Sequence, residues 1–374
     1  MKITRLETFL VKPRWLFLKL HTDEGIVGLG EPILEGRALT CQTAVKELEP
    51  WLIGEDPTRV VHLWQSMYKH AFYRGGPILT SALSGVEQAL WDCYGKKLGV
   101  PVYKLLGGPT RDRIRVYGTA GGPDPERAAR SVREAVAQGF NALKTGVGAA
   151  GRGRIVESPG FTERVVAIFA AMREAAGPEV DLAIDFHGAL SPQTARRLVA
   201  ALGPYHPLFI EEPVQCQNVD VLADIARSTP IPIATGERLF TKWGFREVLE
   251  KRAAAILQPD LSHAGGIMET RLIAGMAEAY YAGIAPHCPL GPIALAACLQ
   301  LDAAIPNFLA QEGGRITGEG YLKTPFRHEQ GFLPLPTGPG LGIELDEDAL
   351  ADKIDHDWQN PKAYSADDGS AIDW

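Results

Sequence analysis

Three acidic residues with the spacing of successive barrel strands carry the clearest chemical signal in the sequence. Asp185, Glu211 and Glu237 each stand at or near the carboxyl end of a short apolar run, in DLAIDFHG, LFIEEPV and IPIATGER. The gaps between them have about the length of one strand, one loop and one helix. Because the strands of a parallel barrel end around one mouth, we expect the three carboxylates to converge there.

Such a cluster is predicted to hold a cation. A single acid at a strand end is more often solvated or caps the next helix, but three acids at matching positions favour a shared site. Crowded carboxylates repel one another unless a cation neutralises them, and oxygen ligands with open positions suit a hard ion such as Mg²⁺. The sequence therefore predicts one Mg²⁺ per chain, bound by these three residues.

Two histidines are predicted at the same mouth. His187 follows Asp185 by two residues, so on a strand its ring would point to the same side; the alternative is a fourth metal ligand or a partner of one. His287 ends the seventh predicted strand (IAPHCP), and Asp260 ends the sixth (ILQPD). A carboxylate that accepts the Nδ1–H fixes the tautomer and makes Nε2 a stronger base. An ordinary loop histidine is the alternative for His287.

Two further residues are expected to face this mouth. Lys144 ends the second predicted strand in LKTGV, where its ammonium group could contact the substrate or a metal-linked oxygen. Glu312 ends the eighth strand. Gly146 stands two residues after Lys144, where a second lysine would be needed to place a base on that side. We interpret His263, in SHAGGI, as a loop residue positioned by its glycines.

Composition narrows the possible partners. The 374 residues are 45% hydrophobic and 22% charged, with a net charge of −7, which does not favour nucleic acid or an anionic membrane surface. The longest apolar run, Ile293 to Leu301, is too short to span a bilayer, and the N-terminus lacks the pattern of a signal peptide. The five scattered cysteines indicate neither a zinc site nor a disulfide framework. We expect a cytoplasmic protein whose partner is a small molecule.

The first 112 residues are predicted to form an α+β capping domain. Alternating apolar residues predict strands at Ile3–Val11, Leu16–Thr22 and Gly25–Glu31. Helical periodicity then predicts helices at Leu39–Leu52, Val60–Tyr68 and Ile78–Leu98. The segment 99–109, GVPVYKLLGGP, has glycine and proline at both ends and is typical of a boundary.

Residues 113–312 alternate between apolar strands and amphipathic helices, which predicts a (β/α)₇β barrel of the TIM type. The predicted strands are Val116–Ala120, Ala142–Val147, Leu182–His187, Leu208–Val214, Ile231–Glu237, Ala254–Asp260, Ile284–His287 and Phe308–Glu312. The predicted helices are Pro125–Gln138, Thr162–Ala176, Pro192–Leu202, Val219–Ala226, Trp243–Glu250, Ile267–Ala282 and Ile293–Ala304.

The C-terminal tail, residues 313–374, is predicted to return to the capping domain and complete it. It is rich in glycine and proline up to about Gly342, and Leu341 to Leu345 is expected to form a short strand. Residues 313–330 are compatible with an ordered lid or with a mobile loop, and the sequence does not distinguish the two.

Nearly the whole chain resembles the mandelate-racemase subgroup of the enolase superfamily. IEEP is shared by that superfamily, whereas LQPDLSHAGG combined with APHCPLGPIALAACL is more specific and is similar to its sugar-acid dehydratases. The segments that carry the resemblance are YRGGPI (73–78), SALSGVEQALWD (81–92), DFHG (185–188), PLFIEEPV (207–214), GER (236–238), LQPDLSHAGGI (257–267) and APHCPLGPIALAACL (285–299).

The resemblance implies a role for each site residue. It implies Mg²⁺ on the three carboxylates, with His287 as the base that removes the proton at C2 of the substrate and Asp260 as the group that raises its basicity. It implies that His187 protonates the leaving 3-hydroxyl and that Glu312 stabilises the enediolate. The implied substrate is a sugar acid, with D-galactonate expected, and homo-oligomers are common in the subgroup.

Several alternatives stay open at this point. They are a dehydratase of another aldonic acid such as gluconate, a racemase or epimerase on the same barrel, and a non-catalytic protein that binds metal and acid. Ala189 stands after DFHG where the family leads us to expect arginine, and the segment after Glu312 is shorter. Both departures lie where substrate length could be read. Substrate contacts from the closing cap are expected from Arg14, Trp15, Tyr73 and Arg74.

Overall fold

The capping domain is built on an antiparallel sheet packed against helices. The computed structural model describes residues 1–147 and 156–373 and gives the sheet order β1-β2-β3. The long helix α3 covers this sheet and is buried over most of its length. The elements are β1 (Ile3–Val11), β2 (Trp15–Thr22), β3 (Val27–Gly30), α1 (Ala38–Glu47), η1 (Glu49–Trp51), α2 (Val60–Lys69), α3 (Pro77–Leu98) and α4 (Val102–Leu105).

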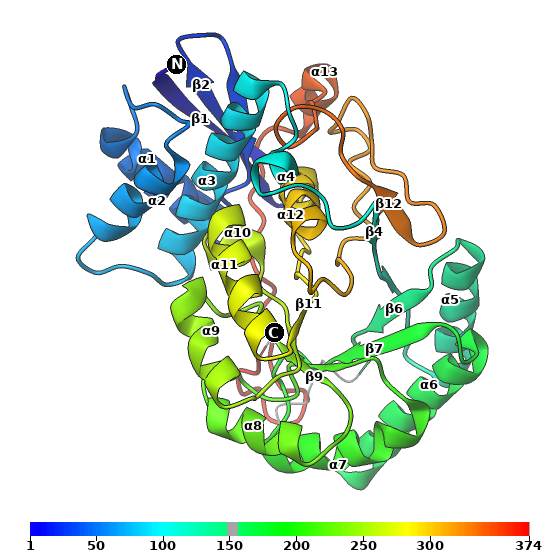
Figure 1. Ribbon diagram of the computed structural model, residues 1–374. Helices are drawn as coiled ribbons and strands as arrows, with labels where there is room; N and C mark the ends of the chain where they lie inside the picture. The colour runs from blue at the N-terminus through cyan, green and yellow to red at the C-terminus, as the bar shows by residue number, and fades with distance from the viewer. Residues whose placement is uncertain (148–155, 374) are drawn as a thin grey trace.

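Below the cap, parallel strands alternate with helices around a barrel (Figure 1). After β4 (Arg113–Arg115), the strands are β5 (Gly118–Thr119), β6 (Ala142–Thr145), β7 (Asp181–Asp185), β8 (Ile210–Glu211), β9 (Ile233–Thr235), β10 (Ile256–Leu257) and β11 (Gly283–Ile284). The helices are α5 (Pro125–Ala137), α6 (Pro159–Ala176), α7 (Pro192–Leu202), η2 (Gly203–Tyr205), α8 (Val219–Arg227), α9 (Thr241–Glu250), α10 (Leu261–Ala264), α11 (Gly266–Ala279) and α12 (Pro292–Ala304).

The predicted fold class is confirmed, with one correction at the eighth strand. Strands β5 to β11 form one seven-stranded parallel sheet in sequence order. The segment predicted as the eighth strand makes only two isolated bridges, from Phe308 to Ile284 and from Gln311 to Val116. Backbone hydrogen bonds at both places still join this segment to β11 on one side and, on the other, to Arg115 and Tyr117, which lie at the end of β4 and just before β5. The curled sheet is therefore closed by an irregular segment.

Local signals in the sequence explain where the first four barrel helices begin. The side chains of Asp124, Ser158, Ser191 and Asn218 accept hydrogen bonds from the first turns of α5, α6, α7 and α8. Such caps satisfy backbone N–H groups that have no partner within the helix, and each is worth about 1 kcal/mol. The loops that lead from the strands into α5, α7 and α8 are short, which leaves these strand ends open toward the cap.

Small residues and one aromatic ring fill the barrel below the strand ends. Inward-facing alanines surround Phe209, and Ile256 completes the cluster, which is almost wholly buried. A closed interior of eight strands leaves room only for side chains, so this layer forms a floor rather than a channel. Its members are Ala183, Phe209, Ala234, Ile256 and Ala285.

Two buried carboxylates of the capping domain bind the N-termini of two barrel helices. Glu31 accepts hydrogen bonds from the backbone N–H groups of Gly291 and Ala294, at the start of α12. Glu87 accepts them from Ile267 and Met268, at the start of α11. Unpaired N–H groups and the helix dipole favour negative charge there. These contacts fix the cap directly above the two barrel segments that follow β10 and β11.

The C-terminal tail returns to the cap, but its regular elements differ from those predicted. The expected strand at 341–345 is wrong; Leu345 makes only an isolated bridge to Leu322. A short strand instead forms at β12 (Phe332–Pro334), which pairs with β4. The last helical turns, α13 (Glu347–Leu350) and η3 (Ala351–Lys353), contact β2 through Lys19 and Glu347 and the turn after β1 through Lys12 and Lys353. Among the described residues, 341–345 meet another strand edge only at the single bridge of Leu345, whereas β4 offers an edge to β12.

Residues 313–330 contain no helix or strand but are tied to both domains. Arg315 donates to the carbonyl of Thr119 at the barrel mouth, and the Tyr321 hydroxyl donates to the carbonyl of Lys12 in the cap. Tyr321 also packs edge-on against Trp15. This segment therefore bridges the mouth and the turn between β1 and β2, which is the arrangement of an ordered lid.

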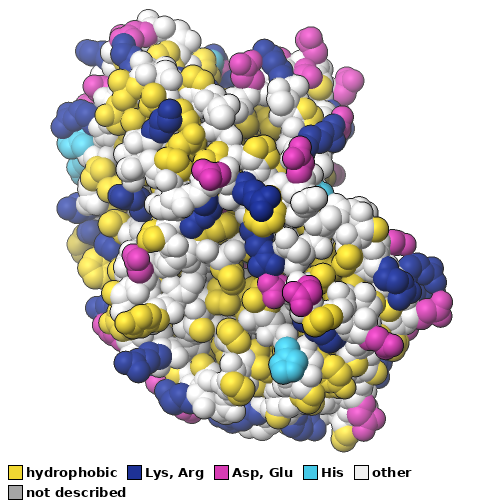
Figure 2. Space-filling model, turned by 45° about the vertical axis from the view of Figure 1, so that its right-hand side comes forward, with side chains coloured by type: hydrophobic (Ala, Val, Ile, Leu, Met, Phe, Trp, Pro, Cys, Tyr) yellow, Lys and Arg dark blue, Asp and Glu magenta, His cyan; other side chains and the backbone are white. Residues whose placement is uncertain are grey.

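Charged side chains of both signs are interspersed with hydrophobic ones on the face shown in Figure 2. Among the described helices, none combines the length and the apolar character that a membrane crossing requires. The five cysteines are all free thiols.

Asp302 in α12 carries a fully buried carboxyl group without a hydrogen-bond partner among the described residues. Burial raises its pKa well above the usual value, although the nearby Arg111 guanidinium opposes the shift. The folded protein therefore keeps a proton that the unfolded chain releases above about pH 4. We expect Asp302→Asn to be the more stable protein at neutral pH, by about 1.4 kcal/mol for each pH unit by which the solution lies above about pH 4, up to the pKa of the folded state.

Urea unfolding at several pH values checks this prediction. The gain in free energy of unfolding should vanish as the pH falls toward about 4, because the carboxyl group is then protonated in both states. The exposed residue Asp352 offers a control, since Asp352→Asn should give no gain at any pH. A loss of stability in Asp302→Asn at neutral pH would contradict the argument.

Candidate active site

The three predicted ligand acids lie together at the carboxyl end of the barrel. Asp185 and Glu211 are the last residues of β7 and β8, and they are direct partners in the parallel register of these strands. Glu237 follows β9 by two residues. One oxygen from each of the three carboxylates lies within 4.8 Å of the other two. Strand register therefore brings together acids that are 26 residues apart in sequence.

A positive side chain already balances part of this charge. The Lys144 ammonium group lies 2.9 Å from Glu211, 3.0 Å from Glu312 and 3.4 Å from Asp185. Burial lowers the pKa of Lys144, but these carboxylates raise it by more, so the ammonium form is retained. Burial and the charge of Asp185 raise the pKa of Glu211 well above its usual value. One lysine does not neutralise three converging acids.

The donor set fits a hard metal cation. It consists of carboxylate oxygens alone, two of the three residues are buried, and a bound divalent ion would remove the repulsion that raises the pKa of Glu211. Zinc and copper prefer sulfur and imidazole ligands, and this cluster offers neither. Asp185, Glu211 and Glu237 are therefore the residues that would hold the ion.

Lys144 and a bound cation compete for the same carboxylates. Removing the lysine charge should therefore strengthen the binding of the cation. Replacing Lys144 with methionine should tighten Mg²⁺ binding at least about tenfold, because like charges about 4 Å apart repel by several kcal/mol in a partly buried site. Titration calorimetry with Mg²⁺ in the absence of substrate measures this. Lys144→Arg keeps the charge and should bind Mg²⁺ as the parent does; weaker binding by Lys144→Met would contradict the prediction.

His187 reaches the cluster from a tight turn. Strand β7 ends at Asp185, and His187 adopts a positive φ of 49°, so it does not continue the strand. Its Nε2 still lies 3.0 Å from Oδ2 of Asp185, and its backbone N–H donates to Oδ1. The hydrogen bond to Asp185 raises the pKa of the imidazole. About half of the side chain, 48%, is exposed toward the mouth.

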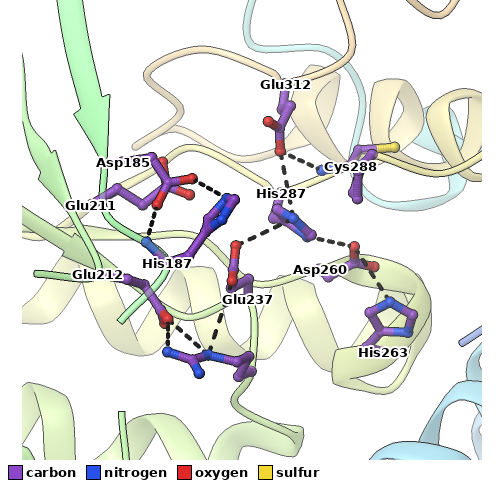
Figure 3. A network of polar contacts seen from close by, with 12 residues as sticks. Asp185, His187, Glu211, Glu212, Glu237, Asp260, His263, His287, Cys288 and Glu312 are labelled. Atoms are coloured by element: carbon purple, nitrogen blue, oxygen red, sulfur yellow. Dashed lines mark hydrogen bonds and ion pairs between the residues drawn. The ribbon is translucent and has the colours of Figure 1, made fainter. Parts of the chain in front are cut away.

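His287 lies on the other side of the cluster and forms a pair with Asp260 (Figure 3). Its Nδ1 is 2.8 Å from Oδ2 of Asp260, so Nε2 faces the site, where Glu237 lies 3.3 Å away. Burial lowers the pKa of His287, but Glu237 and Glu312 raise it by more. A cation bound by Glu237 would cancel much of that charge and favour the neutral ring.

Glu312 completes the ring of charged groups. One oxygen contacts Lys144, and the other accepts the backbone N–H of Cys288 and lies 3.9 Å from Nε2 of His287. Burial raises the pKa of Glu312, but Lys144 and His287 lower it by more, so the carboxylate is ionised. In this state Glu312 can accept hydrogen bonds and cannot donate one.

Sequence reasoning missed two pairs around the site. His263 was expected to be a loop residue, but it lies buried in α10 beside Asp260, and its Nε2 also faces Glu35 of the cap at 3.6 Å. Arg238 forms an ion pair with the buried Glu212, next to the ligand acids. The GER and IEEP motifs contain Arg238 and Glu212 and could have suggested the second pair. No local signal links Glu35 to His263.

The substrate contacts expected from the cap divide into two groups. Arg14 donates to the carbonyl of Pro289, two residues beyond His287, and Trp15 packs on Tyr321 of the bridging segment. Tyr73 is 87% exposed, and Arg74 lies over the ring of Tyr68. In the described part of the chain, neither Tyr73 nor Arg74 makes a hydrogen bond or ion pair to the carboxylate cluster.

Comparison with known families agrees with this architecture. An enolase C-terminal domain-like model matches residues 127–349, and the mandelate racemase / muconate lactonizing enzyme N-terminal domain matches residues 7–107. The two matches together cover most of the cap and the barrel.

Full-length relatives extend the comparison. The chain is 48% identical to a D-galactonate dehydratase of Ralstonia nicotianae and 45% identical to one of Pectobacterium atrosepticum, with both chains covered completely. Among solved structures, an enolase of Agrobacterium radiobacter with bound sodium and L-malate is 32% identical over the whole of both chains, with a TM-score of 0.92. An enolase-superfamily member from Salmonella Typhimurium is 32% identical, with a TM-score of 0.90, over 95% of this chain and 98% of that one.

A capped barrel with three acids at its strand ends, together with these matches, defines the class of protein. The chain belongs to the enolase superfamily, in the mandelate racemase / muconate lactonizing enzyme family. It is an enzyme of the hydro-lyase class, similar over its full length to D-galactonate dehydratases.

Proposed function

We propose that the protein catalyses the Mg²⁺-dependent dehydration of a sugar acid, and that its substrate is D-galactonate, converted to 2-dehydro-3-deoxy-D-galactonate. The observation that carries this proposal is the presence of two imidazoles, His187 and His287, on either side of three converging carboxylates (Figure 3). Removal of a C2 proton and loss of a 3-hydroxyl need one proton acceptor and one proton donor. The named activity of the full-length relatives supports the choice of acid.

The base in this proposal is His287. Asp260 accepts its Nδ1–H, so the lone pair of Nε2 points into the site and can take the proton from C2. A proton next to a carboxylate is very weakly acidic, because its removal leaves two negative charges on the substrate. Asp185, Glu211 and Glu237 would hold the magnesium ion, which would supply a Lewis acid that stabilises this charge.

The acid is His187. Its Nε2 lies 3.0 Å from Oδ2 of Asp185, and this hydrogen bond raises the pKa of the ring. In the proposal the ring carries the proton when the substrate binds. It gives its proton to the 3-hydroxyl, which leaves as water while the electrons of the broken C2–H bond form the C2–C3 double bond of an enol. The enol then becomes the 2-keto-3-deoxy acid by taking a proton at C3 and releasing the proton of its C2 hydroxyl group. Lys144 attracts the substrate carboxylate.

The role proposed for Glu312 needs a change of its protonation. The resemblance implies that it stabilises the enediolate, which requires a proton on the carboxyl group. Lys144 holds Glu312 ionised without substrate, because its ammonium group is 3.0 Å away. When the Lys144 ammonium group turns to the substrate carboxylate, it no longer stabilises the ionised form of Glu312. The pKa of Glu312 then rises. Glu312 can then take up a proton and donate a hydrogen bond.

A panel of acids with Mg²⁺ tests the proposal. D-galactonate, D-gluconate and an aldarate are each incubated with the purified protein, and 2-keto-3-deoxy products are measured. Product from D-galactonate supports the proposal, and product from D-gluconate alone favours the gluconate-type alternative. An epimerised acid without keto product would favour the racemase or epimerase alternative. The sequence argues against that alternative, because Gly146 stands where a second basic side chain would be needed. We also propose a cytoplasmic location and a homo-oligomeric state. Light scattering of the purified protein tests the oligomeric state.

A further inference from the structure

His263 occupies an unusual place between two carboxylates and behind the catalytic pair. Its ring is buried, and it lies at the boundary between the cap and the barrel. On the cap side it faces Ser81 of α3 and Glu35, which follows β3. On the barrel side it faces Asp260, which also binds Nδ1 of His287 (Figure 3).

The hydrogen-bond pattern determines the protonation state of this ring. The Ser81 hydroxyl donates its only proton to the carbonyl of Pro77, at 2.6 Å. It must therefore accept a hydrogen bond from Nδ1–H of His263, at 2.9 Å. The other nitrogen, Nε2, lies 3.6 Å from Glu35 and 3.8 Å from Asp260. A lone pair at Nε2 would face two carboxylates and be repelled by both, so Nε2 carries a proton and the ring is cationic.

We propose that His263 is an imidazolium that connects Glu35 of the cap to Asp260 of the barrel, and thereby positions the Asp260 carboxylate for His287. It acts through Asp260 and does not touch the reacting atoms, so it is a positioning residue. This inference rests on the proposed function for its kinetic consequences. The protonation state of His263 is independent of that function.

The electrostatics agree with the geometry. Burial lowers the pKa of His263, but Asp260 and Glu35 raise it by more, and His287 opposes them only weakly. Burial raises the pKa of Glu35, but His263 and His287 bring it down to about 2. Two further titratable groups of the cap lie near Glu35. Arg14 is 3.7 Å from Glu35 and also donates to the carbonyl of Pro289. Glu31 is buried at the start of α12, and burial, with the charges of Asp260 and Glu35, raises its pKa to about 8. The cap thus contributes a continuous polar connection from Arg14 to the catalytic pair.

Nitrogen NMR of ¹⁵N-histidine-labelled protein tests the protonation state directly. The signals of His263 are assigned as those missing from His263→Asn. Both ring nitrogens are expected to show the shifts of an imidazolium at pH values well above the ordinary histidine pKa of about 6.5. In Glu35→Gln the same signals should titrate at lower pH than in the parent. One protonated and one bare nitrogen in the parent at neutral pH would overturn the proposal.

Kinetics test the positioning role. Glu35→Gln and His263→Asn should each lower kcat about 10- to 100-fold with little change in KM, since lost outer hydrogen-bond partners cost about this much. The double variant should be no worse than the more damaged single variant, because both break one connection. In Glu35→Gln, kcat should also gain a pH dependence that is absent from His263→Asn. Additive losses, or a kcat equal to the parent's in both variants, would refute the role.

Glu87→Gln is the matched control. Glu87 is another buried carboxylate of the cap, but it binds the N-terminus of α11 and does not contact Asp260 or His263. The variant should leave the pH profile of kcat unchanged, which separates loss of the connection from general loosening of the cap. If no acid is turned over, the proposed function fails while the NMR result still decides the state of His263.

Discussion

The His287→Asn variant is expected to lose both dehydration and the exchange of the substrate's C2 hydrogen with D₂O. Asparagine is close to histidine in size and can still bind Asp260, but it has no lone pair basic enough to take the proton. Loss of a general base costs about 10²- to 10⁴-fold. Proton NMR of the substrate in D₂O measures exchange, and the keto-acid assay measures dehydration in the same sample.

The His187→Asn variant should separate the two half-reactions. Its base is intact, so exchange at C2 continues, whereas dehydration falls because hydroxide is a poor leaving group without a proton donor. The exposed His62 on α2 provides a control, and His62→Asn should retain both activities. Retention of dehydration by both active-site variants would show that the two roles are assigned to the wrong residues.

Removal of divalent cations is expected to abolish turnover, and added Mg²⁺ should restore it. The three carboxylates then lose the charge that balances them, and the substrate loses its Lewis acid. Glu211→Gln should raise the Mg²⁺ concentration needed for half-maximal activity by at least about tenfold, because it removes one charged ligand. Activity at a series of Mg²⁺ concentrations measures both effects.

Asp181→Asn is the control for the metal prediction. Asp181 begins β7, so it lies at the opposite end of the strand that Asp185 terminates, and it pairs with Arg115. Its replacement should leave the Mg²⁺ dependence unchanged. Full turnover in the presence of a strong chelator would remove the metal from the proposed mechanism.

The fold was predictable from the sequence because its signals are local. Alternating apolar residues and helical periodicity depend on neighbours within one element. Five strands of the parallel sheet fall inside predicted strands, and the other two, β7 and β11, begin one residue earlier than predicted. The eighth segment was less predictable. Whether Phe308 to Glu312 pairs as a strand depends on the closing geometry of the barrel, which no local pattern encodes. The tail strand expected at 341–345 failed for a similar reason, since β12 formed where β4 offered an edge.

The site residues also divide into those whose meeting follows from their place on the strands and those whose contacts do not. The carboxylates and His287 stand at strand ends, so parallel topology alone predicts that they meet. His187 was expected to lie on the same face of the strand as Asp185. Instead the strand has ended, and a turn with a positive φ at His187 brings the imidazole to Asp185. The predicted roles of these residues stay predictions, although the structure brings their side chains into contact.

The sequence by itself determined the barrel, the cap and the acids at the strand ends, because periodicity and spacing act over a few residues or one βα unit. Only the tertiary structure decided which cap residues meet the pair formed by Asp260 and His287. Glu35 and His263 are 228 residues apart and belong to different domains. Their contact depends on how the cap docks, through the buried carboxylates at the starts of α11 and α12, and a docking geometry is a property of two surfaces rather than of either segment.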